Sequence, residues 1–158
     1  MNITCHDTRS ITTKRIFPKD LNIYQTLFGG DLLQQFDLNS SIAVSRFCHQ
    51  KAFTVSVDHL DFKHPVFEDH ALTVISFVSG CGSRSIETFN QAFGEDLATG
   101  DVYLAAQCFM TYALQRDEQP LFPHLVPETD FEKQLVADYD KRQALNQQWR
   151  QMMPKETL

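Results

Sequence analysis

The spacing of hydrophobic residues changes twice along the chain. Between Leu33 and Phe47 apolar residues recur at helical spacing, directly after the segment Gly29-Gly30-Asp31. Asp31 falls in the first turn of the helix so predicted, where the helix dipole favours a negative charge. The pattern therefore predicts one long helix over residues 30–48 and no other long helix before the C-terminal region.

Strands are predicted on both sides of this helix. Segments that are rich in apolar residues and bounded by glycine, proline or acidic turns are typical of strands. They cover residues 10–17, 53–62, 71–78, 85–93 and 102–114. The last segment is apolar on both faces, which indicates a strand inside the sheet with cover on each side.

The C-terminal region begins after a stiff connection. Three prolines lie between residues 118 and 127, and Thr129 follows with Glu132 three positions later, the spacing of a capping box. Apolar residues from Phe131 to Met152 then recur at helical spacing. We expect one amphipathic helix that packs on the body of its own or a neighbouring subunit.

This order of elements predicts an α+β domain in which an antiparallel sheet wraps around the long helix. The expected organisation is a main domain over residues 1–117, a proline-rich linker over 118–127, and a C-terminal helix and tail over 128–158. Because one helix covers only one side of the sheet, pairing with a second copy is a natural way to complete the core.

Charge and composition exclude several classes of protein. The 158 residues carry a formal net charge of −6, which argues against binding nucleic acid through its phosphates. No run approaches the roughly 20 apolar residues that cross a bilayer, so no membrane partner is expected. The first 15 residues lack a signal-like run, and the four cysteines form no Cys-x-x-Cys pair. We therefore expect reduced thiols and a cytoplasmic location.

Neither a metal site nor a serine nucleophile is expected. His59, His64 and His70 are spaced five and six residues apart, so they share neither a helix turn nor a strand face. The chain also lacks a Gly-x-Ser-x-Gly nucleophile elbow.

An ordered set of short motifs resembles the hotdog-fold acyl-CoA thioesterases of the acyl-CoA hydrolase type. The resemblance spans residues 15–115 and includes a glycine pair that opens the central helix, with an acidic residue seven positions after the second glycine. The motifs are Asp20-Leu21-Asn22, Leu27-Phe28-Gly29-Gly30, Phe36-Asp37, Thr54-Val55-Ser56-Val57-Asp58, Asp61-Phe62, His64-Pro65-Val66, Gly82-Ser83-Arg84-Ser85-Ile86 and Thr111-Tyr112.

The chemistry of thioester hydrolysis needs an activated water and a stabilised oxyanion. Asp37 can supply the first as general base, or less favourably as a nucleophile, and its apolar helix neighbours suggest a partial desolvation that would strengthen a base. The backbone amides of Gly29 and Gly30 at the helix start can supply the second, because no side chain blocks their approach to a carbonyl.

The resemblance also implies a site shared between subunits, with the helix start from one chain and the acidic residue from the other. Three residues before the glycine pair, where the family commonly carries Asn or Asp, this chain has Thr26 beside Gln25. Thr26 would lie opposite Asp37 of the partner. A homo-oligomer built from dimers, a hexamer by resemblance, is expected.

The substrate would be an acyl-CoA, with no further cofactor. Arg84 with Ser83 and Ser85, and secondly Lys63, are the candidates for contacting the phosphates of CoA, because guanidinium groups bind phosphate in a bidentate way. Two alternatives stay open. One is a non-catalytic hotdog domain that senses acyl-CoA, and the other is a hotdog dehydratase, although its usual helix histidine is missing before His49.

Overall fold

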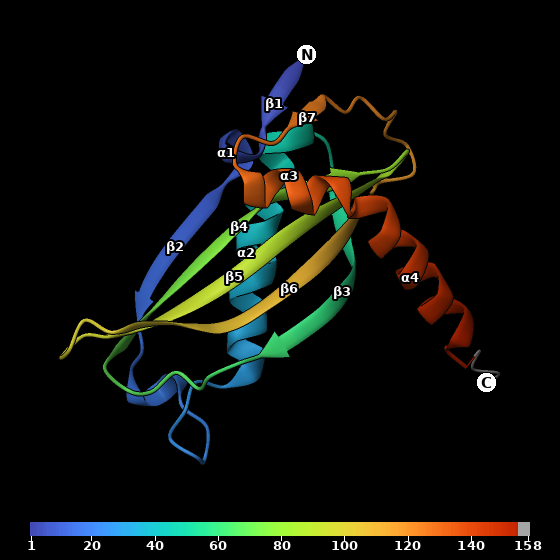
Figure 1. The fold of residues 1–158 in the computed structure, drawn as a ribbon. Coiled ribbons are helices and arrows are strands. Elements are labelled where there is room, and N and C mark those ends of the chain that lie inside the picture. The colour runs from blue at the N-terminus through green and yellow to red at the C-terminus, as the bar shows by residue number, and fades with distance from the viewer. Residues whose placement is uncertain (155–158) are drawn as a thin grey trace.

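The computed structural model describes residues 1–154 and has an antiparallel five-stranded sheet at its centre (Figure 1). The strand order is β2-β4-β5-β6-β3, and every neighbouring pair is antiparallel. The strands are β2 (Ser10–Arg15), β3 (Ala52–Phe62), β4 (His70–Cys81), β5 (Ser85–Asp96) and β6 (Val102–Leu114). All five lie where the hydrophobic pattern predicts them, and β6 is an interior strand as expected.

Helix α2 (Gly29–Cys48) crosses one face of this sheet. Its buried side includes Leu32, Phe36, Val44 and Phe47, which pack in one cluster with apolar residues of the strands. Burying a large apolar side chain contributes roughly 1.5–3 kcal/mol, so this face supplies much of the stability. The predicted α+β hotdog arrangement is confirmed.

Short elements at the N-terminus were not predicted. They are β1 (Asn2–Thr4), α1 (Cys5–Thr8) and a 3-10 turn, η1 (Pro18–Asp20). Strand β1 pairs in parallel with β7 (His124–Val126), which lies in the proline-rich segment. Strands of three residues are too short to show a period of two, and only tertiary contact brings these two together.

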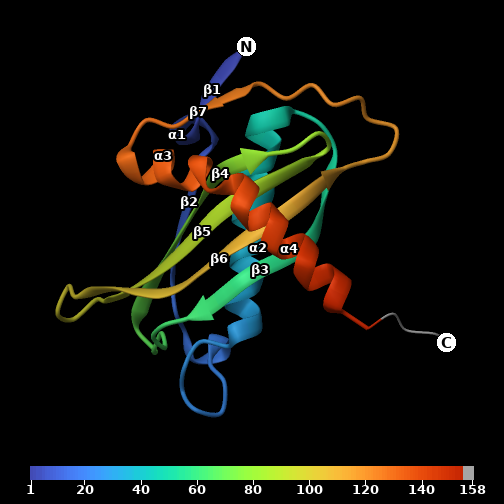
Figure 2. The ribbon, with the colours of Figure 1, turned by 45° about the vertical axis from the view of Figure 1, so that its right-hand side comes forward.

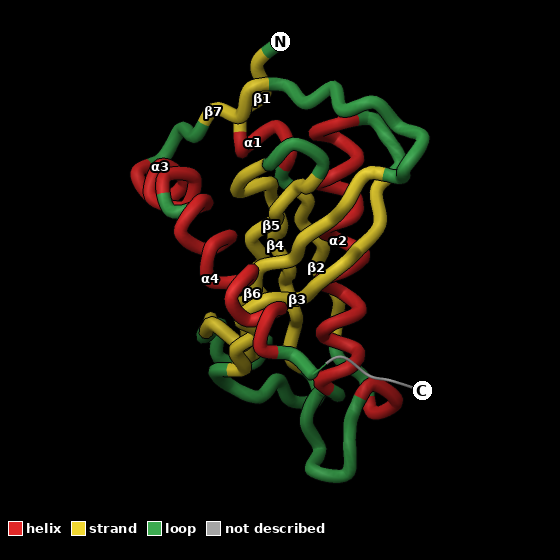
Figure 3. Tube along the Cα trace, turned by 90° about the vertical axis from the view of Figure 1, so that its right-hand side faces the viewer, coloured by secondary structure: helices red, strands yellow, loops and turns green. Residues whose placement is uncertain are grey.

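Two helices, rather than the single one predicted, cover the opposite face of the sheet (Figures 2 and 3). They are α3 (Asp130–Ala137), with the predicted capping box at Thr129, and α4 (Tyr139–Met152). The break falls at Asp138, a poor helix former, and the Arg142 guanidinium donates to the carbonyl of Leu135 at 2.7 Å. The last four residues of the predicted C-terminal segment lie outside the described residues.

No helix among residues 1–154 is long and apolar enough to cross a membrane. The four cysteines are free thiols, with Cys5, Cys48 and Cys108 buried. Burial raises the pKa of the Cys48 thiol, as is typical of a structural cysteine.

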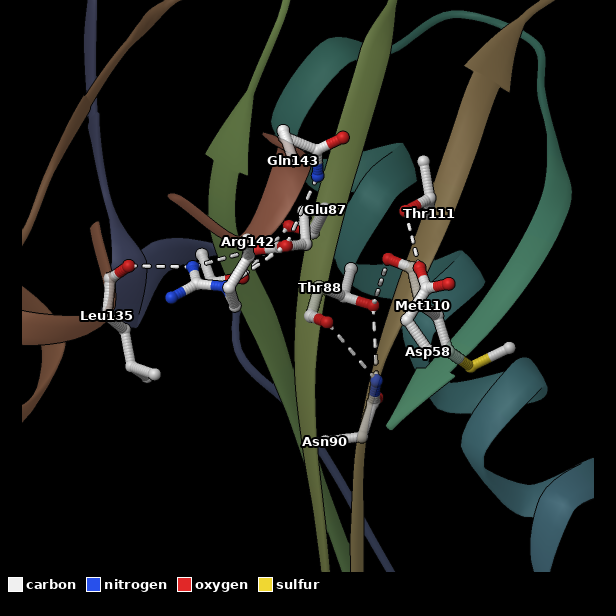
Figure 4. A network of polar contacts seen from close by, with 10 residues as sticks. Asp58, Glu87, Thr88, Asn90, Met110, Thr111, Leu135, Arg142 and Gln143 are labelled. Atoms are coloured by element: carbon white, nitrogen blue, oxygen red, sulfur yellow. Dashed lines mark hydrogen bonds and ion pairs between the residues drawn. The ribbon is translucent and has the colours of Figure 1, made fainter. Parts of the chain in front are cut away.

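A buried ion pair attaches α4 to the sheet (Figure 4). The carboxylate of Glu87 on β5, whose side chain is 0% exposed, accepts from Arg142 at 2.7 Å. Ser79 donates to the same carboxylate at 2.7 Å, and the Arg142 guanidinium lies 4.4 Å from the ring centre of Phe109. The charge of Glu87 is therefore compensated only while α4 stays in place.

Breaking this pair should destabilise the fold. We expect Arg142→Ala to lower the free energy of unfolding by about 3–5 kcal/mol, because it leaves a buried carboxylate without its cation. Urea denaturation measures the loss, and adding Glu87→Gln should recover part of it. Lys141→Ala is the matched control, since Lys141 pairs with Asp138 in solvent at 2.7 Å and should cost about 0–1 kcal/mol. Equal losses in the two single variants would contradict this assignment.

Candidate functional site

Asp37 lies near the middle of α2, at the edge of the helix face that packs on the sheet. Its side chain is half-buried, and the Oδ1 atom accepts from the Thr54 hydroxyl at 2.6 Å and from the Tyr112 hydroxyl at 3.0 Å. The two donors are opposite one another in the pairing of β3 with β6. Two strands of the same chain therefore bind this carboxylate through one of its oxygen atoms.

A pocket of about 420 Å³ opens beside Asp37. Both polar and apolar side chains line it. Its lining is formed by Gly30, Leu33, Gln34, Asp37, Thr54, Val57 and Met110. A carboxylate next to an apolar cavity is an arrangement suited to activating water against a largely apolar substrate.

The start of α2 carries unused hydrogen-bond donors. The N-cap residue Phe28 makes no side-chain cap, and within residues 1–154 neither the Gly29 nor the Gly30 amide donates a hydrogen bond. Free amides at a helix start point outward and carry the positive end of the helix dipole. They can bind a carbonyl oxygen or an oxyanion, as predicted for this glycine pair.

A second pocket, of about 250 Å³, lies at this helix start. Gly29 and Thr26 line it together with Lys63 and His64 from the segment after β3. Lys63 is exposed and forms an ion pair with Asp61. The pocket thus combines the free Gly29 amide with the ammonium group of Lys63.

Thr26 belongs to the loop before the helix, and the side chain of Asn22 organises that loop. Asn22 donates to the Thr26 hydroxyl at 3.0 Å, and its Oδ1 accepts from the amides of Tyr24 at 2.8 Å and Thr26 at 3.3 Å. No role for Asn22 was predicted from the sequence. An asparagine that bonds to the backbone two residues later is a known turn signal, so this contact could have been anticipated.

The glycine amides and the Asp37 carboxylate are separated within one chain. Seven residues divide Gly30 from Asp37, which is about 10 Å along a helix. The free amides also point away from the carboxylate, because helical N–H groups point towards the N-terminus. Gly29 lines one pocket, whereas Gly30 and Asp37 both line the other. Because the amides and the carboxylate are separated along the helix axis, one chain presents two half-sites, and a single thioester group cannot touch both.

The residues expected to contact CoA lie apart from these pockets, with the exception of Lys63. Arg84 is half-buried in the turn between β4 and β5, and its guanidinium donates to the carbonyls of Gln115 at 2.8 Å and Glu118 at 3.1 Å. Ser83 is exposed in the same turn, and Ser85 begins β5. Arg84 thus holds the loop after β6 in this structure.

Thr54 and Tyr112 are the contacts that the sequence analysis missed. Both lie within the motifs of the family resemblance, but neither was linked to Asp37. Their neighbourhood depends on the antiparallel register of β3 and β6, which pairs residues 58 positions apart. No group of three or more His, Cys, Asp or Glu side chains in the described part of the chain could hold a metal ion.

Comparison with known proteins places these features in context. A family model described as the thioesterase superfamily matches residues 24–100. The uncharacterized acyl-CoA thioester hydrolase YkhA of Bacillus subtilis is 37% identical over 130 residues, covering 81% of this chain and 76% of that protein. An apo-hexameric acyl-CoA thioesterase has a TM-score of 0.90 at 26% identity, over 97% of this chain and 99% of the other.

A further solved structure contains ligands. The acyl-CoA hydrolase of Staphylococcus aureus, in complex with butyryl coenzyme A, coenzyme A and coenzyme A disulfide, has a TM-score of 0.85 at 25% identity. The similarity covers 96% of this chain and 93% of that one.

The contacts of Arg84 lead to a prediction about stability. Arg84→Ala should lower the free energy of unfolding by about 1–3 kcal/mol, because partly buried carbonyls lose a charged donor. Hydrogen exchange should become faster at the amides of residues 114–119, and thermal denaturation should report the loss. Lys133→Ala, at an exposed position paired with Asp130, is the control. Unchanged hydrogen exchange in that loop would show that the hydrogen bonds of Arg84 do not stabilise it in solution.

Proposed function

The chain belongs to the hotdog-fold acyl-CoA thioester hydrolases of the thioesterase superfamily, and we propose that it hydrolyses acyl-CoA in sites that two protomers build together. In each site, Asp37 of one protomer activates water and the Gly29 and Gly30 amides of the other bind the thioester carbonyl. Support comes from one observation above all: the free amides and the half-buried carboxylate lie about 10 Å apart along one helix, and Gly29 lines a different pocket from Asp37.

The reaction follows from these groups. A water molecule gives a proton to the Asp37 carboxylate as its oxygen attacks the thioester carbon. Negative charge then gathers on the carbonyl oxygen, where the amides of Gly29 and Gly30 stabilise it. When the tetrahedral intermediate collapses, the carbon–sulfur bond breaks, and the leaving CoA thiolate takes the proton held by Asp37, which restores the carboxylate. The products are a free carboxylic acid and CoA.

The surface of the chain supports pairing with a second copy. Strand β3 hydrogen-bonds only to β6, so its other edge is open within the described residues. Side chains that are more than half exposed lie along it, including Phe53, Val55 and Phe62, and Leu38 of α2 is similarly exposed. A long apolar edge of this kind is an aggregation hazard unless another chain covers it. We propose dimers joined through this edge, and a hexamer built from three such dimers, since one relative is described as hexameric.

Thr26 and Asn22 are placed at the glycine end of the proposed site. In a shared site the loop from one protomer approaches Asp37 of the other, so the Thr26 hydroxyl can help to hold the attacking water. Asn22 fixes that hydroxyl through the hydrogen bond at 3.0 Å. No carboxylate is required at this position, because the base comes from the partner's helix.

For CoA itself we place Lys63 ahead of Arg84. Lys63 lines the pocket that contains Gly29, whereas the Arg84 guanidinium is already bonded to backbone carbonyls. Arg84, with Ser83 and Ser85, remains the proposal for a more distant phosphate of CoA. The acyl chain fits the pocket beside Asp37, where Leu33, Val57 and Met110 supply apolar surface. We propose the cytoplasm as the location, because all four cysteines are free thiols.

Removing the base should remove most of the activity. We expect Asp37→Asn to lower kcat/KM by at least about 100-fold for any acyl-CoA that the wild-type protein hydrolyses, because the amide cannot accept the proton. Release of free CoA thiol, measured over a panel of chain lengths, reports the rate. An Asp37→Asn protein with the wild-type rate would remove Asp37 from the mechanism. Binding of acyl-CoA without turnover by the wild-type protein would favour the sensing alternative.

Mixing two variants tests whether the site is shared. Gly29→Pro removes one proposed oxyanion donor and should preserve the helix, because proline is tolerated at the first helical position and Phe28 before it has an extended backbone (φ −64°, ψ 127°). Gly29→Ala keeps the amide and is the matched control.

Gly29→Pro and Asp37→Asn should each be nearly inactive alone. After unfolding and refolding together at equal amounts, random pairing should recover about a quarter of the wild-type rate, because each mixed dimer contains one intact site. A mixture that stays as inactive as its components, with mixed dimers shown by mass spectrometry, would place both halves of the site in one chain.

A further inference from the structure

We propose that Tyr112 is a positioning residue that binds one oxygen of the Asp37 carboxylate and thereby leaves the other, Oδ2, as the atom that takes the proton from water. The inference rests on the proposed function, since it concerns the same carboxylate. It assigns a task to a buried residue that lies behind the site and does not line either pocket.

The two oxygens of Asp37 have different surroundings. Oδ1 accepts from the Thr54 hydroxyl at 2.6 Å and the Tyr112 hydroxyl at 3.0 Å, whereas no hydrogen bond to Oδ2 is formed within residues 1–154. No Lys, Arg or His of the described chain lies within ion-pair distance of this carboxylate. A carboxylate oxygen without donors keeps its lone pairs available for a water molecule.

Tyr112 is held firmly enough to orient another group. It lies on interior strand β6, is 2% exposed, and its hydroxyl is also 3.2 Å from the backbone carbonyl of Asp37. Its single proton is therefore shared between the side chain and the backbone of one residue, which restricts rotation of that side chain. Burial, and the neighbouring Asp37 carboxylate, raise the pKa of Tyr112, so the phenol stays protonated and can donate.

Helix α2 is also bonded to the sheet about one turn after Asp37. The Ser40 hydroxyl, three residues after Asp37, donates to Asn90 Oδ1 at 2.5 Å and accepts from the Thr88 hydroxyl at 3.1 Å. All three residues are fully buried between α2 and the sheet. These bonds determine the rotation and height of α2, so Asp37 and Tyr112 meet in one geometry.

Thr54 and Tyr112 differ in what else they can touch. The Thr54 hydroxyl lines the pocket beside Asp37, where it can also contact water or substrate. Tyr112 is closed off from that pocket and can act only through Asp37. Loss of its hydroxyl should therefore change the chemical step and leave substrate binding unaffected.

Tyr112→Phe tests this directly. We expect kcat to fall about tenfold, the effect of losing one hydrogen bond to a charged group, with less than about a twofold change in KM. The acid limb of kcat/KM against pH should move to higher pH, because the carboxylate loses a donor that favours its charged form. A role in packing alone would not move that limb.

Tyr103→Phe is the matched control. Tyr103 lies on the same strand, and its hydroxyl bonds to His70 at 2.8 Å and to the Pro65 carbonyl at 3.1 Å, with no contact to Asp37. It should keep the wild-type kcat and pH profile. Thermal unfolding of both variants, assayed well below their melting temperatures, separates lost activity from lost folding.

The outcomes distinguish this inference from the proposed function. A folded Tyr112→Phe protein with unchanged kcat and acid limb, beside an inactive Asp37→Asn protein, would overturn the positioning role and leave the proposed function standing. A fall in kcat with an unmoved acid limb, matched by Tyr103→Phe, would also overturn it. An active Asp37→Asn protein would overturn the proposed function itself.

Discussion

Burial of one face of α2 against the sheet is the constraint on which the rest of the structure depends. Phe36 is fully buried, and a step of one residue turns the direction of a side chain by about 100° on a helix. Asp37 is thereby carried to the border between packed core and open pocket. If the helix turned by one residue, the carboxylate would enter the core or face solvent, and the donors on β3 and β6 would meet a different side chain.

The same packing separates the two chemical functions of α2. Its free amides lie at one end and its carboxylate lies two turns along the axis, and a rigid helix cannot bring them together. In the proposed dimer, association brings the amides of one protomer to the carboxylate of the other, and the edge of β3, which is open within the described residues, supplies the surface for it. This proposal couples stability to activity, because the apolar edge that a second protomer would cover is also the surface that would complete the site.

The face of the sheet opposite α2 is covered by helices of the same chain. These helices are α3 and α4, and α4 is attached through the buried pair of Glu87 and Arg142. Buried ion pairs add little net stability compared with apolar packing, but removing one partner is strongly destabilising because it leaves a buried charge uncompensated. The pair thus favours one placement of α4, and the edge of β3 is left free for a second protomer.

Much of this could be read from the residues in order. The helix over 30–48 and all five strands of the sheet follow from local periodicity, because such signals lie within about 20 residues of one another. The proposed roles of Gly29, Gly30 and Asp37 came from the resemblance of short motifs to a known family. The tertiary structure alone decided that Thr54 and Tyr112 both bind Asp37, that Arg84 binds the loop after β6, that β1 pairs with β7, and that the C-terminal helix breaks at Asp138. Each of these depends on strand register or packing between residues far apart in the chain, and a local pattern contains no information about which distant groups will meet.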